Sequence, residues 1–477
     1  MVLKRLRFVE LIRVAVGLAA LLLAPSAIWA QANVVPPLTD AEQQALELIT
    51  ERSVTGTIAF LASDEMGGRG TPSPEFQIAS AYVAARFAAA GLQGGGPEGS
   101  FYQSTNVETT QLPGEGVVLS VGVPREHYGL LAAGKEPVNY EGDLKNADPN
   151  SDQPLAGAVV LPYDAAYSGR RGMIALMRAI GGLRERGAAA VILPVPADSE
   201  LIGQARALKA RPQMPGRGGP SLPVLLVRAE DEWAGHCALV IPPAVTANAE
   251  VRNVIGVLPG SDMELADEAI VFSAHLDHLG TRPGEADPIY NGADDDASGV
   301  TAVLSLADAF GALAQKPRRT VIFMTFWGEE RGLLGSKHFA ENPLWPLEKI
   351  VANINIEMIG RPEAGARNKV WMTGWERSDL GEGMVRAAER TGTLIFAHPK
   401  YSGDMLYRAS DNWSLASKGV VAHSFSAGSL HEDYHQPTDD WQKLERDHMT
   451  AVIRGLFAGS LPLAAGDFTP QAKPEKK

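Results

Sequence analysis

Segments that have the composition of buried strands alternate with helix-like segments over residues 254–425. The strand candidates are short, apolar and rich in β-branched and aromatic residues, as expected for strands covered on both faces. Strand–helix alternation of this kind predicts an α/β fold, with a mostly parallel mixed sheet sandwiched by helices. The strand candidates are 254–258, 269–274, 320–327, 350–356, 370–374 and 419–425, and the helix candidates are 299–314, 333–341 and 380–390.

Acidic residues and histidines gather at the ends of these strand candidates, and open α/β sheets place ligands and catalytic groups at the carboxyl ends of their strands. Two further clusters of the same kind lie in loops. We therefore expect one site that is built from several segments. The clusters are His275 with Asp277, Asp294–Asp296, Glu329 with Glu330, Glu357, and the loop from His431 to Asp439 that contains His435.

Each cluster taken alone has a simpler interpretation. His275 could be a satisfied structural histidine, because a short His-x-Asp motif is weakly specific. The three aspartates could cap the following helix, and Glu329–Glu330 could be a solvated helix start. We assign His278 to a turn and His431 to the surface. The order of all five clusters, each at a strand end or in a loop, favours a site over these separate interpretations.

Together the clusters offer two histidines and three carboxylates, plus one spare glutamate. Mixed imidazole and carboxylate ligands suit zinc, with manganese or cobalt as alternatives. One aspartate of the three could bridge two metals about 3.5–4 Å apart. One glutamate of Glu329–Glu330 could bind metal while the other remains free as a base.

The composition narrows the class and the compartment. With 477 residues, the chain exceeds the usual size of one domain, and its net charge of −13 argues against a nucleic-acid partner. Residues 1–30 resemble a signal peptide, with Lys4, Arg5 and Arg7 before an apolar stretch and small residues at its end. We expect an exported protein, periplasmic or extracellular, with no stable membrane insertion after cleavage; a retained membrane anchor is the alternative. Cys237 is the single cysteine, so an internal disulfide is excluded.

Changes in composition and hydrophobic pattern along the chain predict the domain organisation. Residues 31–115 begin with a helix from the capping box Thr39–Glu42 to about Arg52, and a second helix is expected over residues 75–90, with a glycine-rich turn at 67–70 between them. Residues 116–248 read as a β-rich inserted module, because short apolar strands occur there without a carboxylate–histidine cluster. The main domain resumes over residues 249–466, and residues 467–477 are expected to form a disordered tail.

The ordered set of motifs resembles the co-catalytic di-zinc aminopeptidases, the family of bacterial leucyl aminopeptidase, aminopeptidase Y and glutamate carboxypeptidase. The resemblance runs from about Leu38 to Leu463. The inserted segment 116–248 resembles a protease-associated domain, notably at residues 155–160 (LAGAVV) and 187–192 (GAAAVI). The flanking segments 31–115 and 249–466 would then form one catalytic peptidase domain.

The resemblance implies a role for each matching residue. His275 would bind one zinc, with Asp277 as its orienting partner, and Asp295 would bridge both ions. Glu330 and His435 would bind the other zinc, and Glu329 would be the general base. Two positions depart from the family pattern: Glu357 replaces the usual aspartate ligand of the His275 metal, and Asn412 follows Ser410–Asp411 where relatives often carry histidine.

The implied reaction is removal of N-terminal amino acids from peptides by a metal-bridging hydroxide, with Glu329 moving the proton to the leaving amine. A glutaminyl-cyclase-like acyltransferase with one zinc, a carboxypeptidase of the same family and a non-catalytic binding relative are the alternatives. The presence of both His275 and Asp295 favours two metals and hydrolysis. The sequence makes no prediction of the preferred substrate residue or the oligomeric state.

Overall fold

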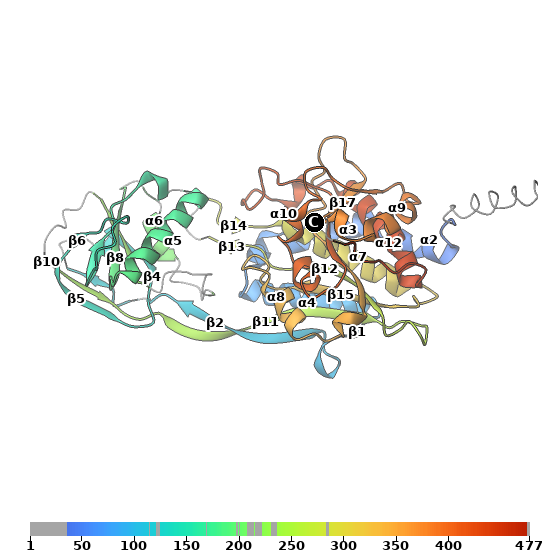
Figure 1. Cartoon of the computed structure of the whole chain (residues 1–477), viewed down its shortest axis with the longest axis horizontal. Coiled ribbons are helices and arrows are strands. Elements are labelled where there is room, and N and C mark those ends of the chain that lie inside the picture. Colours follow the sequence, from blue (N-terminus) through green and yellow to red (C-terminus); the bar gives the residue numbers. More distant parts are fainter. Residues whose placement is uncertain are drawn as a thin grey trace, which may run out of the picture. The chain divides into compact units, whose positions relative to one another are not determined.

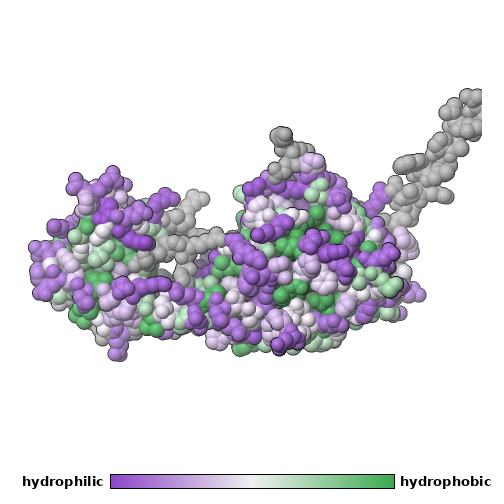
Figure 2. All heavy atoms as spheres, turned by 60° about the horizontal axis from the view of Figure 1, so that its bottom comes forward, coloured by the Kyte–Doolittle hydropathy of each residue, from purple (hydrophilic) through white to green (hydrophobic). Residues whose placement is uncertain are grey.

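The computed structural model describes residues 36–113, 115–120, 125–167, 169–196, 199, 201–207, 214, 222–229, 236–282 and 286–474. The predicted signal peptide, residues 1–30, lies outside the described residues. None of the helices among these residues is long and apolar enough to cross a membrane. On the face shown in Figure 2, hydrophilic residues predominate and apolar ones occur in small groups between them.

A mixed sheet forms the centre of the fold, with strands in the order β1-β11-β15-β12-β16-β19-β17-β18 and β2 also paired to β11 (Figure 1). The four central strands β15, β12, β16 and β19 are parallel, whereas β11 and β17 run antiparallel to their central neighbours. The predicted α/β fold with a mostly parallel mixed sheet is confirmed. The strands are β1 (Gln93–Gly94), β2 (Tyr102–Gln111), β11 (Val245–Leu258), β12 (Ala269–His275), β15 (Thr320–Phe326), β16 (Ile350–Ile356), β17 (Lys369–Met372), β18 (Leu394–Phe396) and β19 (Ala422–Ser426).

Alternate residues of the central strands feed two apolar layers, because successive side chains of a strand point to opposite faces. On one face, Phe272 and Phe323 stack at 5.6 Å and join Phe310 of α7 and Phe457 of α12. On the other face, Ala269 and Val271 belong to a core that includes Phe339 of α8 and Leu415 of α11. Helices therefore cover both faces, as predicted. The helices are α7 (Ser298–Ala312), α8 (Leu334–Glu341), α9 (Leu380–Glu389), α10 (Asp404–Tyr407), α11 (Asn412–Ala416) and α12 (Arg446–Ala465).

The segment before the inserted module contributes the helices α2, α3 and α4, and one of the sequence predictions for it is wrong. The predicted helix from Thr39 to about Arg52 is wrong, because the chain leaves the helix after Glu47 and starts a second one at Glu51. Thr50 caps that second helix, and its side chain and that of Ser53 bond reciprocally to each other's backbone N–H. A local capping box thus determined the break. The helices are α2 (Asp40–Glu47), α3 (Glu51–Leu61) and α4 (Pro74–Ala89).

A long antiparallel ribbon of β2 and β11 leads into the inserted module and back (Figure 1). Gln111 pairs with Val245 at its far end, so the module enters and leaves through neighbouring strand ends. The module has a three-stranded sheet, β3-β10-β5, and a five-stranded sheet, β4-β9-β8-β7-β6. Its elements are β3 (Val118–Leu119), β4 (Tyr128–Ala132), β5 (Val138–Asp143), β6 (Lys145–Asn146), β7 (Ala158–Val160), α5 (Gly169–Glu185), β8 (Ala190–Val195), α6 (Leu201–Ala207), β9 (Val224–Arg228) and β10 (His236–Ile241).

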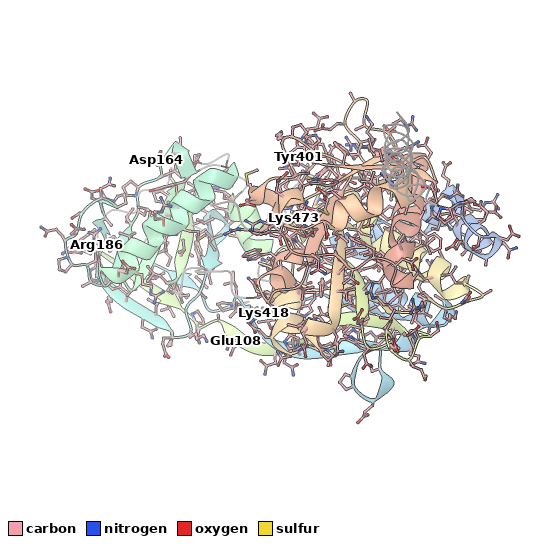
Figure 3. All side chains as sticks on the ribbon, turned by 45° about the vertical axis from the view of Figure 1, so that its right-hand side comes forward. Glu108, Asp164, Arg186, Tyr401, Lys418 and Lys473 are labelled. Carbon is pink, nitrogen blue, oxygen red and sulfur yellow. The ribbon has the colours of Figure 1, made fainter. Side chains whose placement is uncertain are left out.

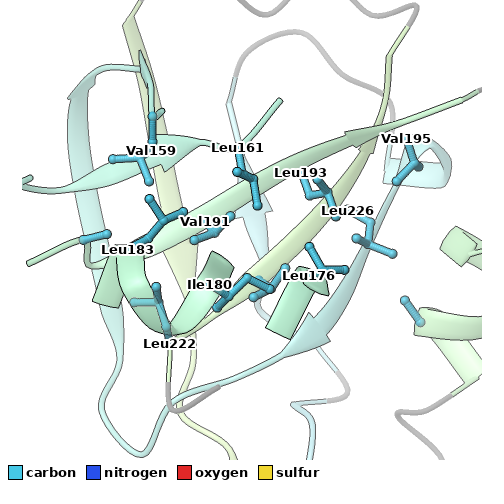
Figure 4. Close-up of a cluster of buried hydrophobic side chains, with 14 of the residues drawn as sticks. Val159, Leu161, Leu176, Ile180, Leu183, Val191, Leu193, Val195, Leu222 and Leu226 are labelled. Carbon is cyan, nitrogen blue, oxygen red and sulfur yellow. The ribbon is translucent and has the colours of Figure 1, made fainter. Parts of the chain in front are cut away.

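The inserted module has its own apolar core between α5 and the five-stranded sheet (Figure 4). Leu176, Ile180 and Leu183 of α5 pack on the sheet at i, i+4 and i+7 spacing. Arg186, labelled in Figure 3, ends this helix by donating to the carbonyl groups of Asp148 (2.7 Å) and Gln153 (2.8 Å). The inserted module thus contributes apolar clusters of its own, in addition to those of the central sheet.

The C-terminal segment after α12 differs from the predicted disordered tail. Residues 467–474 lie against the region of the central sheet. Arg319 donates to the carbonyl group of Phe468 (2.8 Å), and Ala472 forms a bridge with Ser378. The segment is held because the buried Arg319 guanidinium needs acceptors, which the tail supplies. Residues 475–477 lie outside the described residues.

Candidate metal centre

The carboxyl ends of β12, β15 and β16 bring the predicted site residues into one region. His275 ends β12, Glu329 and Glu330 follow β15, and Glu357 follows β16. These strands are parallel neighbours, so their carboxyl ends meet at one edge of the sheet. Asp295 comes from the loop before α7 and His435 from the loop after β19.

Asp295 lies between two histidines that are 160 positions apart in the sequence. Its Oδ1 is 3.0 Å from Nε2 of His275, and its Oδ2 is 3.0 Å from Nε2 of His435. The side chain of Asp295 is 6% exposed and that of His275 is 1% exposed. One carboxylate thus faces an imidazole with each oxygen, the arrangement in which a single aspartate can serve two cations.

Glu330 joins this group together with a histidine that we had assigned to a turn. Oε1 of Glu330 is 3.3 Å from Nε2 of His435 and 2.8 Å from Nδ1 of His278. Ligand atoms of His278, Asp295 and Glu330 all lie within 4.8 Å of one another. The turn assignment of His278 is therefore wrong; its neighbour in sequence, Asp277, had drawn the interpretation toward His275 alone.

The three consecutive aspartates have three different tasks. Asp294 accepts a hydrogen bond from the backbone N–H of Gly360 (2.6 Å), and Asp296 accepts from the N–H groups of Gly299 (2.9 Å) and His275 (3.2 Å). Both therefore fasten backbone segments around the site. Only Asp295 directs its carboxylate to both His275 and His435, and the family resemblance gave the bridging role to this middle residue.

Asp277 is placed differently from our expectation. The Nδ1 atom of His275 is 3.0 Å from the backbone carbonyl oxygen of Asp277, not from its carboxylate. The carboxylate instead accepts a hydrogen bond from the N–H of Glu329 (3.1 Å) through Oδ1, and its Oδ2 has no partner. The reason is geometric, since the chain turns after His275 and only the backbone of Asp277 can reach back. Asp277 thus orients His275 through its main chain and Glu329 through its side chain.

Glu357 lies beside two serine hydroxyls at the floor of the site. Burial raises the pKa of its carboxyl group, and the positive charge of His275 and hydrogen bonds with Ser424 and Ser410 oppose that shift. Ser424 also accepts from Asn355 (3.0 Å) and donates to Asn412 (2.9 Å). The departures from the family pattern at 357 and 412 therefore occur in one connected polar layer.

The loop that carries His435 is tied to the aspartate segment at both ends. Asp439 accepts hydrogen bonds from the backbone N–H groups of Asp294 (3.0 Å) and Asp295 (3.2 Å). His431, which we had placed on the surface, has a side chain only 9% exposed and lies 3.2 Å from Asp294 Oδ2. That assignment is wrong, because the imidazole contacts the carboxylate of Asp294, which lies 137 positions away in the sequence. Tyr434 was missed altogether; its ring stacks on His435 at 3.9 Å.

The electrostatics of the group follow from burial and from imidazole–carboxylate contacts. Burial raises the pKa of Glu329 well above its usual value. Burial alone would do the same to Asp295, but the His275 and His435 imidazoles hold the pKa of Asp295 well below its usual range. The neighbouring carboxylates raise the pKa of His435 to about 9, against the effect of its burial. Asp295 is thus kept ionised between two imidazoles, whereas burial favours the protonated form of Glu329.

Several ligand-type atoms at the centre have no hydrogen-bond partner. These atoms are Asp295 Oδ2, Glu330 Oε1 and both ring nitrogens of His278, all buried. Buried polar atoms without partners are costly, and short distances without hydrogen-bond geometry are expected when the atoms face a shared cation. Nitrogen and oxygen donors in this combination fit zinc.

Comparison with known proteins shows which solved structures share this fold and which family model the sequence matches. The fold is that of zinc aminopeptidases of known structure: the aminopeptidase BSAP from Bacillus subtilis matches with a TM-score of 0.59 at 17% identity, over 90% of this chain and 97% of that one. The aminopeptidase from Aneurinibacillus sp. strain AM-1 matches with a TM-score of 0.57 at 18% identity, over 91% of this chain and 97% of that one. Residues 253–458 match the sequence model of Peptidase family M28.

Curated relatives share only part of the sequence. A probable zinc metalloprotease of Pyrenophora teres f. teres is 35% identical over 114 residues, 24% of this chain and 24% of the relative. Leupeptin-inactivating enzyme 1 of Streptomyces exfoliatus is 28% identical over 151 residues, 31% of this chain and 32% of that protein. The chain thus spans about a quarter of the length of the first curated relatives it matches.

Proposed function

We propose that this protein is a zinc metallo-aminopeptidase that removes N-terminal amino acids from peptides. The observation that carries the proposal is the position of Asp295, which faces His275 with one carboxylate oxygen and His435 with the other (3.0 Å each). His275 and Glu357 would hold one Zn²⁺ ion and Glu330 and His435 a second, with Asp295 as the ligand common to both. Mn²⁺ or Co²⁺ could replace zinc with the same donors.

His278 adds a further imidazole nitrogen 2.8 Å from Glu330, so His278, Asp295 and His435 could complete the donor set on the Glu330 side. Glu357, with its longer side chain, would hold its ion less rigidly than the aspartate that is usual in the family.

Bound zinc would polarise the scissile carbonyl group and lower the pKa of a water molecule to near neutrality. Glu329 would accept the proton of that water and pass it to the leaving amine. Its raised pKa suits this task, because burial makes its carboxylate a stronger base toward the water molecule. The hydrogen bond from its backbone to Asp277 keeps the residue at the strand end.

The charge of the site supports action at a free N-terminus. A cluster rich in carboxylates attracts the ammonium group of a peptide, whereas a carboxypeptidase needs a cation for the substrate carboxylate. Arg361 and Lys443, from the neighbouring loops, both lie within 3.0 Å of Asp433 and are engaged there. The aminopeptidase is therefore favoured over a carboxypeptidase of the same family.

The wider context of the activity rests on the sequence. The signal-like residues 1–30 support export to the periplasm or the extracellular space, where peptides would be the substrates. We also propose that residues 116–248 are a protease-associated domain. Its two sheets and separate core support this assignment.

The first test is to count metals by elemental mass spectrometry in the purified protein, followed by a panel of aminoacyl-anilides. We expect two zinc ions per chain and release of the anilide from substrates with a free amine, but not from their N-acetylated counterparts. One ion per chain with turnover of N-terminal glutaminyl peptides would instead indicate cyclase-like chemistry. Neither metal nor turnover after zinc addition would refute the proposal.

A further inference from the structure

A single arginine from the segment before the inserted module lies beneath the metal centre. Arg69 is fully buried, with 0% of its surface exposed, and its guanidinium donates four hydrogen bonds. The acceptors are all backbone carbonyl oxygens. They belong to Leu61 (2.5 Å), Leu276 (2.9 Å), Asn291 (2.8 Å) and Gly292 (2.9 Å).

Three of these acceptors belong to the segments that carry metal ligands. Leu276 is the residue between His275 and Asp277, and it lies 207 positions from Arg69. Asn291 and Gly292 lead directly into the aspartate segment that contains Asp295. One planar guanidinium therefore sets the distance between the main chain after β12 and the main chain before α7, and these two segments supply His275 and the shared carboxylate.

The backbone around Arg69 is fitted to this position. Gly70 forms a parallel bridge with His278, and the N–H of His278 lies 3.4 Å from the carbonyl oxygen of Arg69. Gly68 approaches so closely that a Cβ atom there would lie 2.3 Å from the carbonyl oxygen of Tyr290 and 2.6 Å from that of Gly280. The Gly67–Gly70 segment is thus a fitted clamp on the site loops and not the simple connecting turn that the sequence suggested.

The charge of Arg69 is part of the same arrangement. Burial lowers the pKa of Arg69 to about 10, so the group remains cationic at neutral pH. Nearby carboxylates favour that charge. They are Asp296, Asp277, Asp439 and Asp295.

We propose that Arg69 is a positioning residue of the metal centre, which fixes the separation of the His275 and Asp295 segments through its backbone hydrogen bonds. It touches neither substrate nor metal. The inference rests on the proposed zinc centre, and it adds that this centre requires the N-terminal segment 64–71.

Two variants separate position from charge. Arg69→Lys keeps the charge but loses the planar fork, whereas Arg69→Met keeps most of the length and loses the charge. If Arg69 only neutralised carboxylates, Arg69→Met would bind zinc more tightly and Arg69→Lys would match the wild type. If it positions the ligands, both variants bind zinc roughly 10- to 100-fold more weakly, the usual effect of removing a group that orients metal ligands.

Arg319 provides a matched control within the same domain. It is 2% exposed and also donates to backbone carbonyl groups, those of Leu463 (2.9 Å) and Phe468 (2.8 Å). It precedes β15, at the opposite end of the strand from Glu329. Arg319→Lys should lower the melting temperature without changing the zinc dissociation constant, which shows how much of any effect comes from general destabilisation.

The experiment measures zinc dissociation constants by chelator competition, and the visible absorption of the Co²⁺-loaded proteins, for the wild type and the three variants. Weaker zinc binding and an altered cobalt spectrum in both Arg69 variants, but not in Arg319→Lys, would support the inference. Unchanged zinc affinity and spectrum in folded Arg69→Lys and Arg69→Met would overturn it. If the wild type binds zinc and the Arg69 variants bind it equally well, only this inference is refuted. If the wild type binds no zinc, the proposed function is refuted as well.

Hydrogen exchange on the wild type gives an answer even if neither Arg69 variant folds. If the clamp stabilises the metal-bound arrangement, zinc must stabilise the clamp by the same free energy, because linkage is reciprocal. Zinc should therefore slow amide exchange in residues 64–71 together with 275–278 and 291–297. Unchanged exchange in 64–71, with slowed exchange in the other two segments, would overturn the inference.

Discussion

A buried arginine lies at each end of the central parallel strands, but the two arginines have different surroundings. At the amino end, Arg319 reaches one acidic partner, Glu268 (2.8 Å), and carbonyl groups of the C-terminal segment. At the carboxyl end, Arg69 likewise donates to carbonyl groups, but the carboxylates around it belong to a cluster with unpartnered oxygens. A buried arginine by itself thus indicates a rigid part of the structure. Ligand-type atoms without hydrogen-bond partners beside it indicate a candidate functional site.

Buried histidines show the same contrast. Among the metal-centre imidazoles, carboxylates raise the pKa of His435 to about 9 despite its burial. At the amino end of β19, burial lowers the pKa of His423 to about 4, and its ring nitrogens contact Ser378 (2.7 Å) and the carbonyl oxygen of Thr373 (2.7 Å). Neighbouring carboxylates, and not burial, therefore distinguish His435 from His423.

The strongest test of the functional end is Glu329→Gln. The variant should retain its zinc and its melting temperature, because Glu329 is not a ligand, and lose turnover by roughly 10²- to 10⁴-fold, the usual contribution of a general base. Steady-state kinetics on an aminoacyl-anilide, with metal analysis of the same sample, would measure both. Full activity of the variant would assign the proton transfer to another group.

Removal of metal should destabilise the protein through the carboxyl end of the sheet. Zinc at 100 to 1,000 times its dissociation constant contributes about 3–4 kcal/mol to stability, so a chelator should lower the melting temperature. Asp295→Asn should melt at the same temperature with and without chelator, whereas Arg319→Lys should keep the full response. A chelator response in Asp295→Asn as large as that of the wild type would contradict the assignment of the shared ligand.

Acid should destabilise the structural end through His423. Its pKa is about 4 when folded and 6.5 in the ordinary state, so the unfolded chain takes up the proton first as the pH falls. The contribution is complete above pH 6.5 and is lost between pH 6.5 and 4, by up to about 3 kcal/mol. Chemical denaturation of the wild type and His423→Gln across this range would measure the difference, and parallel pH profiles would show that His423 does not contribute.

The smallest effect is expected from Glu357→Asp. Aspartate is usual at this position in the family, and the variant should retain or improve zinc occupancy, with a change of less than the roughly tenfold typical of altered ligand support. Metal titration of the variant would check this. Loss of both ions would show that Ser410 and Ser424 hold the site open for the longer side chain.

Much of the fold was visible in the sequence because buried parallel strands are continuous apolar runs. The strand predicted over residues 350–356 has the observed bounds, and the helix predicted over 75–90 appears as Pro74–Ala89. Glu329, Glu330 and Asp295 come together because strand ends and loops of one sheet edge must meet.

The missed contacts share a physical cause. Arg69 binds backbone carbonyl groups, which carry no sequence signal, and three of its four partners lie beyond the inserted module. His278 and His431 each meet a carboxylate from a distant segment, so nothing in their local sequence distinguishes them from loop histidines. The C-terminal segment was expected to be a disordered tail, but Arg319, far away in the sequence, holds it through the carbonyl group of Phe468 and the hydroxyl group of Thr469.

The β2–β11 ribbon has a consequence for the order in which the domain is assembled. Residues 93–111 find their sheet partner only after the whole inserted module has been synthesised, and closing such a long loop has an entropic cost that only later contacts offset. The module, with its own core, can fold first and bring Gln111 and Val245 together. Because Arg69 precedes the ribbon and the zinc ligands follow it, a competent metal site would mature late, once the two halves of the chain have joined.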